Sequence, residues 1–203
     1  MPDYTTDIVI DGFLKCGAET ELDLSRYPKL KTLTIGSLSY ENVNVTKFIG
    51  MSELESVVIG DSCFCGLHSR HSSPGGEFVL KNCPKLKTLK IGCDSFTVFT
   101  VCEIENVDAL ETIEIGRMDA RETMDFRRME RDVICFSNAS LELKGLVATN
   151  ESRLDMPSLK SLLFGDKAFL KCHQALFESS FFSPDSLQRL ACIGVLSDGR
   201  ICV

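Results

Sequence analysis

The chain has 203 residues, a net charge of −7 and a sequence pI of about 5.0. This length is enough for one domain with a substantial core, or for a short run of repeats. The acidic balance argues against broad binding to nucleic-acid phosphates, and no apolar run approaches the ~18 residues of a membrane span.

The N-terminal segment, MPDYTTDIVIDGF, lacks the basic start and apolar stretch of a secretory signal. We therefore expect the ten cysteines to be reduced thiols, acting as small buried apolar residues, rather than a disulfide framework. The lack of such a signal in this segment also favours a cytoplasmic location. Glycosylation sequons at Asn44, Asn138 and Asn150 leave a cell-surface location open. The sequence shows no N-terminal cap, so the chain could be a fragment of a longer surface protein with further repeats before it.

Six related segments recur along the chain. Each begins with Leu, ends with Gly and carries apolar residues that alternate as a half-buried strand requires. The segments end at Gly36, Gly60, Gly92, Gly116, Gly165 and, in a degenerate copy, Gly194. Their leading leucines are separated by 24, 32, 24, 49 and 28 residues. The base period is therefore 24, and the longer intervals hold insertions.

A second short strand is expected ahead of the leading leucine, at residues 22–24, 46–48, 78–80 and 102–104. An aromatic residue follows several of the glycines, at Tyr40, Phe64, Phe96 and Phe169, and is expected to stack on its neighbours in the core. One repeat cannot bury its own apolar face, so neighbouring repeats must stack. The pattern predicts a mainly β domain over residues 1–203, a solenoid with two short strands in each of about six rungs.

Two segments depart from the pattern. Residues 117–132 form an insertion with five Arg and five acidic residues, interpreted either as a solvated excursion or as a contact arm. The contact-arm residues would be Arg121, Phe126, Arg127 and Arg128. Residues 183–203 predict a short helical turn at Ser183 and a final hairpin that caps the open end of the stack.

The segment FGDKAFLKC, residues 164–172, resembles the IG-x-x-A/S-F-x-x-C stretch of the BspA-like subclass of leucine-rich repeats. IDGFLKC, residues 10–16, resembles it in shortened form, and IGCDSF and IGDSCF match its first half. The resemblance covers roughly residues 8–177. It implies a leucine-rich-repeat solenoid that serves in protein–protein interaction or adhesion.

The residue after each leading leucine alternates in charge: Lys31, Glu55, Lys87, Glu111 and Lys160. Opposite charges on adjacent strands attract, so this alternation predicts that the segments lie side by side in order. It also predicts that no further rung lies between Glu111 and Lys160, although 49 residues separate them. Lys90 is expected to pair with Glu114 one rung away.

The stretch CFCGLHSRH holds Cys63, Cys65, His68 and His71, four residue types that bind zinc. Their spacing is tighter than that of ordinary zinc fingers, and the following SSPGG indicates a loop. We interpret the stretch as a loop in which Phe64 is a core residue, with a metal site as the alternative, and expect no cofactor.

No nucleophile, paired-carboxylate or phosphate-loop pattern points to an enzyme. The function predicted from the sequence is a non-enzymatic protein-binding module whose partner is unidentified, with Val58 and Leu163 as exposed apolar contacts on the strands. The alternatives are a metal- or redox-responsive protein that uses the Cys/His loop, and a structural repeat fragment of a larger surface adhesin.

Overall fold

A computed structural model shows the arrangement of the chain. It describes residues 4–14, 19–24, 26–66, 75–116, 135–136, 139–144, 146–147, 154–155, 161–164, 175–178, 194–195 and 201–202.

The first sheet holds six parallel strands in the order β1-β3-β5-β7-β9-β13. These are β1 (Asp7–Ile10), β3 (Thr32–Ile35), β5 (Ser56–Ile59), β7 (Thr88–Ile91), β9 (Thr112–Ile115) and β13 (Ser161–Phe164). Neighbouring strands pair without a register shift, so that Ile35, Ile59, Ile91 and Ile115 form one row. The glycine-ended segments of the sequence therefore lie side by side.

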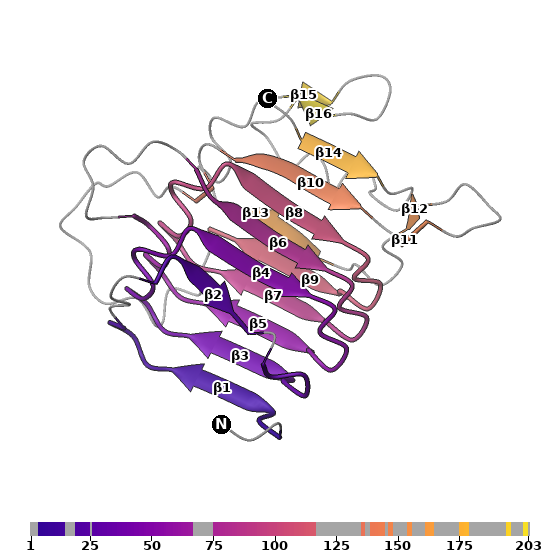
Figure 1. The fold of residues 1–203 in the computed structure, drawn as a ribbon. Coiled ribbons are helices and arrows are strands. Elements are labelled where there is room, and N and C mark those ends of the chain that lie inside the picture. Colours follow the sequence, from indigo (N-terminus) through magenta and orange to yellow (C-terminus); the bar gives the residue numbers. More distant parts are fainter. Residues whose placement is uncertain are drawn as a thin grey trace.

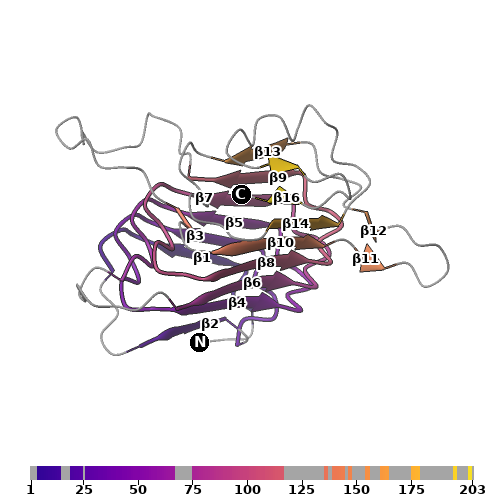
Figure 2. The same ribbon diagram turned by 90° about the horizontal axis from the view of Figure 1, so that it is seen from above.

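The second sheet takes the strands that alternate with these along the chain (Figure 1). Its parallel part consists of β2 (Glu21–Asp23), β4 (Val45–Ile49), β6 (Glu77–Lys81), β8 (Val101–Glu105), β10 (Ser140–Lys144) and β14 (Ala175–Glu178). A view turned by 90° shows the two sheets as separate layers (Figure 2). Successive strands thus alternate between two layers, in a β-rich, repeat-like arrangement.

Four short strands complete the structure. β15 (Gly194–Val195) and β16 (Ile201–Cys202) form an antiparallel hairpin, and β16 also pairs with β14. The predicted final hairpin is therefore present, at the end of the second sheet. β11 (Leu146–Val147) and β12 (Leu154–Asp155) form a separate antiparallel pair.

The sequence predicted the elements well. The described residues are mainly β and contain no helix, and β2, β4, β6 and β8 overlap the four second-sheet strands that were expected, whereas β10 and β14 were not predicted. β9 pairs directly with β13, which confirms that no strand of the first sheet lies between them. Lys160, the insertion at 117–132 and the helical turn expected at Ser183 lie outside the described residues.

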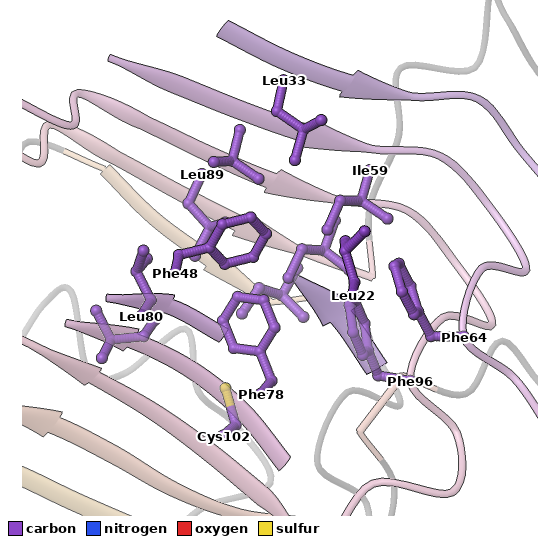
Figure 3. Close-up of a cluster of buried hydrophobic side chains, with 14 of the residues drawn as sticks. Leu22, Leu33, Phe48, Ile59, Phe64, Phe78, Leu80, Leu89, Phe96 and Cys102 are labelled. Carbon is purple, nitrogen blue, oxygen red and sulfur yellow. The ribbon is translucent and has the colours of Figure 1, made fainter. Parts of the chain in front are cut away.

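The core lies between the sheets, because alternate residues of each strand point inward. Figure 3 shows Leu33, Ile59 and Leu89 of the first sheet facing Phe48 and Phe78 of the second. All five are at most 1% exposed. Among the strand residues whose burial is described, the inward positions are apolar except Thr46, so the core is continuous from one repeat to the next.

A column of stacked aromatic rings runs along this core. Tyr40 and Phe64 lie 5.3 Å apart at 4°, Phe64 and Phe96 4.6 Å apart at 9°, and Phe96 and Phe136 4.7 Å apart at 3°. Each of these residues has a positive φ, which turns its side chain inward at the corner after a strand. The column confirms three predicted core aromatics and adds Phe136, while Phe169 lies outside the described residues.

Phe13 does not join this column, although IDGFLKC resembles the repeat motif. Its amide donates to the carbonyl of Ser37, as the amide of Leu38 does to Asp61, so Phe13 is equivalent to Leu38. Its side chain is 62% exposed. The sequence likeness therefore fails at this position, because the shortened segment shifts the aromatic residue out of register.

We expect Phe96→Ala to destabilise the protein by about 3–5 kcal/mol, since the ring is fully buried and contacts four other phenylalanines. The matched control is Phe13→Ala, which removes an exposed ring and should change the free energy of unfolding by less than about 0.5 kcal/mol. Urea denaturation measures both. Equal effects of the two substitutions would contradict the stacked column.

Candidate interaction surface

The outward face of the first sheet is the most regular surface of the described structure. Its first row consists of hydroxyl side chains, from Thr32, Ser56, Thr88 and Thr112. The backbone of Ser161 in β13 is in register with Thr112. Because parallel strands lie about 4.8 Å apart, these residues repeat at a fixed spacing along the sheet.

The second outward row is chemically mixed and contains Val58. This half-buried residue lies between Thr34 of β3 and Lys90 of β7. Lys90 in turn forms the predicted ion pair with Glu114, at 3.3 Å. Leu163 follows in register with Glu114, in the backbone of β13. By backbone register, Val58 and Leu163 occupy equivalent strand positions, with Lys90 and Glu114 between them.

The predicted charge ladder runs along one border of this face. The amides of Glu55, Lys87 and Glu111 each donate to the carbonyl of the preceding member of the ladder, with nitrogen–oxygen distances of 2.7–2.9 Å. Alternating charges are thus neighbours in space. Beside them, the ammonium of Lys85 lies 2.8 Å from the carboxylate of Glu53, and its hydrogen bond is the main reason that the pKa of Glu53 is lowered.

The outward face of the second sheet is dominated by ion pairs between adjacent strands. Lys81 contacts Glu103 at 2.7 Å and Glu105 at 3.1 Å, and the hydrogen bond to Glu103 is the main cause of its raised pKa. Lys47 contacts Glu77 at 3.1 Å. The glutamates 103 and 105 thus share a lysine, whereas Glu114 lies on the other sheet, so these residues do not form one acidic site.

Cys63 and Cys65, the first half of the candidate metal motif, are buried in the core region. Cys63 is 0% exposed and Cys65 is 7% exposed. The thiol of Cys63 donates to the carbonyl of Gly36, with a sulfur–oxygen distance of 3.3 Å, and that of Cys65 to the carbonyl of Ser62. His68 and His71 lie outside the described residues.

The hydrogen bond of Cys63 recurs at the same place in the following repeats. The hydroxyl of Ser95 donates to the carbonyl of Gly60 at 2.9 Å, and the thiol of Cys135 to that of Gly92 at 3.7 Å. Each donor directly precedes a stacked aromatic residue and reaches back to the preceding repeat. Cys63 is therefore explained by a structural role that a serine fulfils elsewhere.

The sequence analysis did not predict this column of donors. The feature that could have predicted it is a small Ser or Cys directly before each core aromatic residue: Ser39, Cys63, Ser95 and Cys135. The residue types differ, but each presents one short donor group. At Ser39 the hydroxyl accepts a hydrogen bond from the amide of Leu14, which extends the column toward β1.

Burial also governs the thiol chemistry. It raises the pKa of Cys63 to about 12 and that of Cys83 to about 11, because a charged thiolate is poorly solvated in the core. Cys63, Cys65, Cys83, Cys93, Cys102 and Cys135 are all thiols. Within the described residues, no group of three or more His, Cys, Asp or Glu side chains could hold a metal ion.

The remaining candidate contacts are Arg121, Phe126, Arg127 and Arg128 of the insertion, which lie outside the described residues. None of the three comparisons with known proteins finds a match, whether with family profiles, curated proteins or solved structures. In the described part of the chain, no helix has the length and apolar character needed to cross a membrane.

We expect Cys63→Ser to be tolerated, with a change in unfolding free energy below about 1 kcal/mol, because serine occupies the equivalent position at residues 39 and 95. Cys63→Ala removes the donor to Gly36 and should cost about 1 kcal/mol more than the serine variant. Urea denaturation distinguishes the two, and a serine variant less stable than the alanine variant would contradict the proposed donor role.

The buried thiols should also resist alkylation. With a pKa of about 12, the native Cys63 holds roughly a thousandfold less thiolate at pH 8 than an ordinary thiol of pKa 9.0. Iodoacetamide followed by mass spectrometry should label the half-buried Cys93 before Cys63. Because the folded state retains the proton, the contribution of Cys63 to stability is complete below pH 9 and is lost as the pH rises toward 12. Rapid labelling of native Cys63 would overturn this assignment.

Proposed function

We propose that the chain is a leucine-rich-repeat solenoid of about six rungs, similar to the BspA-like subclass, and that it acts as a non-enzymatic protein–protein interaction module. The support for the solenoid is the alternation of the chain between two parallel sheets with unshifted register. The support from sequence is the recurrence of the Leu-to-Gly segment at each first-sheet strand from β3 onward.

The observation that carries the interaction role is the outward face of the first sheet. Hydroxyl groups repeat there at strand spacing, and the next row holds Val58 beside the Lys90–Glu114 ion pair. A rigid sheet loses little backbone conformational entropy when its side chains bind a partner. A protein surface with matching hydrogen-bond groups and one apolar contact over Val58 would fit this array.

The second sheet is a poorer candidate for the same role. Its outward lysines, Lys47 and Lys81, already contact glutamates of the next strand. A partner would have to break these pairs or leave them buried, and either outcome costs free energy. The first sheet also carries an ion pair, Lys90 with Glu114, but its row of hydroxyl groups is separate from that pair, and this contrast favours the first sheet as the binding surface.

Val58→Glu tests the proposal, because it places a carboxylate in the centre of the row, opposite Lys90. In affinity capture from extracts of the source cell, we expect this variant to lose at least about tenfold of the specifically retained partner, as a buried charge in an interface would. Val101→Lys is the matched control, since it places a charge opposite Glu77 on the outward face of the second sheet. Capture that falls equally for both variants, or for neither, would contradict the assignment of the surface.

The insertion offers a separate test. If residues 117–132 form a contact arm, replacing Arg121, Arg127 and Arg128 by Ser and Phe126 by Ala should reduce capture severalfold. The urea midpoint should stay within error of the parent, because β9 and β13 pair with each other regardless of the insertion. Unchanged capture would remove the arm from the binding surface and leave the Val58 row.

A further inference from the structure

Thr46 is an exception in the core of the second sheet. By register it lies in one row with Leu22, Phe78, Cys102 and Leu141, and Figure 3 shows the first three of these in the core. Thr46 is 0% exposed, and its hydroxyl group has no hydrogen-bond partner. A buried hydroxyl without a partner costs free energy, which a valine of similar shape would not. The packing of the core therefore gives no reason for a threonine here.

The neighbouring sequence supplies a reason that lies outside the fold. Thr46 is the third residue of Asn44-Val45-Thr46, the acceptor sequence for an N-linked glycan. The enzyme that attaches the glycan requires a hydroxyl residue two positions after the asparagine, and it acts on the extended chain. The hydroxyl of Thr46 is thus needed before the segment folds and is buried afterwards.

The folded structure keeps Asn44 accessible. Asn44 lies directly before β4 and its side chain is exposed. Its amide donates to the carbonyl of Thr20 and its carbonyl accepts from the amide of Glu77, both at 2.9 Å, so the backbone is held between β2 and β6. The residue beside it on the β6 side is Gly76, which has no side chain. A glycan on Asn44 would therefore leave both neighbouring strands in place.

The other sequons do not show this combination in the described part of the chain. Ser140 is the third residue of the sequon at Asn138, but its hydroxyl donates to the carbonyl of Thr100 at 3.3 Å and so has a structural role. Asn138 and Asn150 lie outside the described residues. Among the sequon hydroxyls that the structure describes, only that of Thr46 has no structural partner.

We propose that Asn44 is a site of N-linked glycosylation and that Thr46 is retained in the core as part of its acceptor sequence. The side-chain amide nitrogen of Asn44 forms a bond to the anomeric carbon of an oligosaccharide. The bond from this carbon to the pyrophosphate of a lipid-linked donor breaks, and the amide releases one proton. Asn44 belongs to the second sheet and Val58 to the first, so the proposal does not depend on the interaction surface. It favours the cell-surface location over the cytoplasmic one.

Buried thiols are compatible with the oxidising compartment in which such glycans are attached. Cys63 and Cys83 are 0% exposed, and burial raises their pKa values to about 12 and about 11. Thiol–disulfide exchange requires both a thiolate and access to it. These cysteines should therefore persist as thiols in the folded protein, as the structure has them.

Mass spectrometry of the protein purified from the source cell tests the site. Trypsin cleaves after Lys31 and Lys47 and releases residues 32–47, which contain Asn42 and Asn44. Asn42 is the internal control, because it is also exposed but has no hydroxyl residue two positions later. We expect enzymatic release of the glycan in water enriched in heavy oxygen to leave labelled aspartate at position 44 and not at 42. A peptide without a glycan would overturn the proposal.

Two substitutions of Thr46 separate the acceptor sequence from the exposure of the asparagine. When the full chain is expressed in the source cell, Thr46→Val should lower the glycosylated fraction of residues 32–47 at least about tenfold. Thr46→Ser keeps the hydroxyl and should keep the glycan. A glycan that persists in the valine variant would contradict the assignment.

The unmodified protein tests the other half of the argument. In protein produced in bacteria without the glycosylating enzyme, Thr46→Val should raise the urea midpoint, because it removes an unpartnered hydroxyl and keeps the branched shape of the side chain. Asn44→Gln is the matched control, and its midpoint should equal that of the parent, since the side chain is exposed. An unchanged or lower midpoint for Thr46→Val would show that the hydroxyl serves the fold, and would overturn the inference drawn from its burial.

Discussion

Successive repeats approach each other so closely at the ends of β3, β5 and β7 that no side chain fits between them. A Cβ atom on Gly60 would lie 2.6 Å from the amide nitrogen of Ser37, and one on Gly92 would lie 2.6 Å from that of Asp61. Glycine is therefore required for close backbone approach, and not for a positive φ at these two positions. The approach allows the amide of each glycine to donate to the isoleucine carbonyl of the preceding strand, at 2.7 and 2.8 Å. It also brings the next corner within reach of the Ser or Cys donor, and so sets the spacing at which the aromatic rings stack.

The strands could be predicted because each has a local signal. Leu, alternating apolar residues and Gly recur within seven residues, and the register follows from their order along the chain. The alternating charges added an independent check, since they linked segments 49 residues apart without reference to the loop between them. Periodicity therefore predicts the strands wherever equivalent residues recur at a constant spacing.

The parts that were missed have physical causes. Phe136 belongs to the aromatic column, but the insertion at 117–132 separates it from the preceding glycine by 20 residues instead of four. Phe13 matches the motif in residue type, but its hydrogen bond makes it equivalent to Leu38, two residues before the column residue Tyr40. Cys63 suggested metal chemistry because its neighbours in sequence are Cys65 and two histidines. Its neighbours in space, Gly36 and Ser95, give it the role of a structural donor.

The same periodic order also explains why the surfaces differ in their capacity to bind. An interior strand has its backbone groups, its apolar face and its charges matched by the strands on both sides, as β6 is through Lys81 to β8 and through Glu77 to β4. A partner can bind there only through outward residues that the adjacent strands do not match. Val58 is such a residue, because its neighbours in the row are a threonine and a lysine. The terminal strand β1 is matched on one side only. The hydroxyls of Thr6 and Thr32 donate to the carboxylate of its Asp7, whereas its Val9 is 70% exposed. Val58, at the same position two strands further along, is half-buried because strands on both sides cover it, so the exposure of this row depends on the neighbouring strands and not on the residue type.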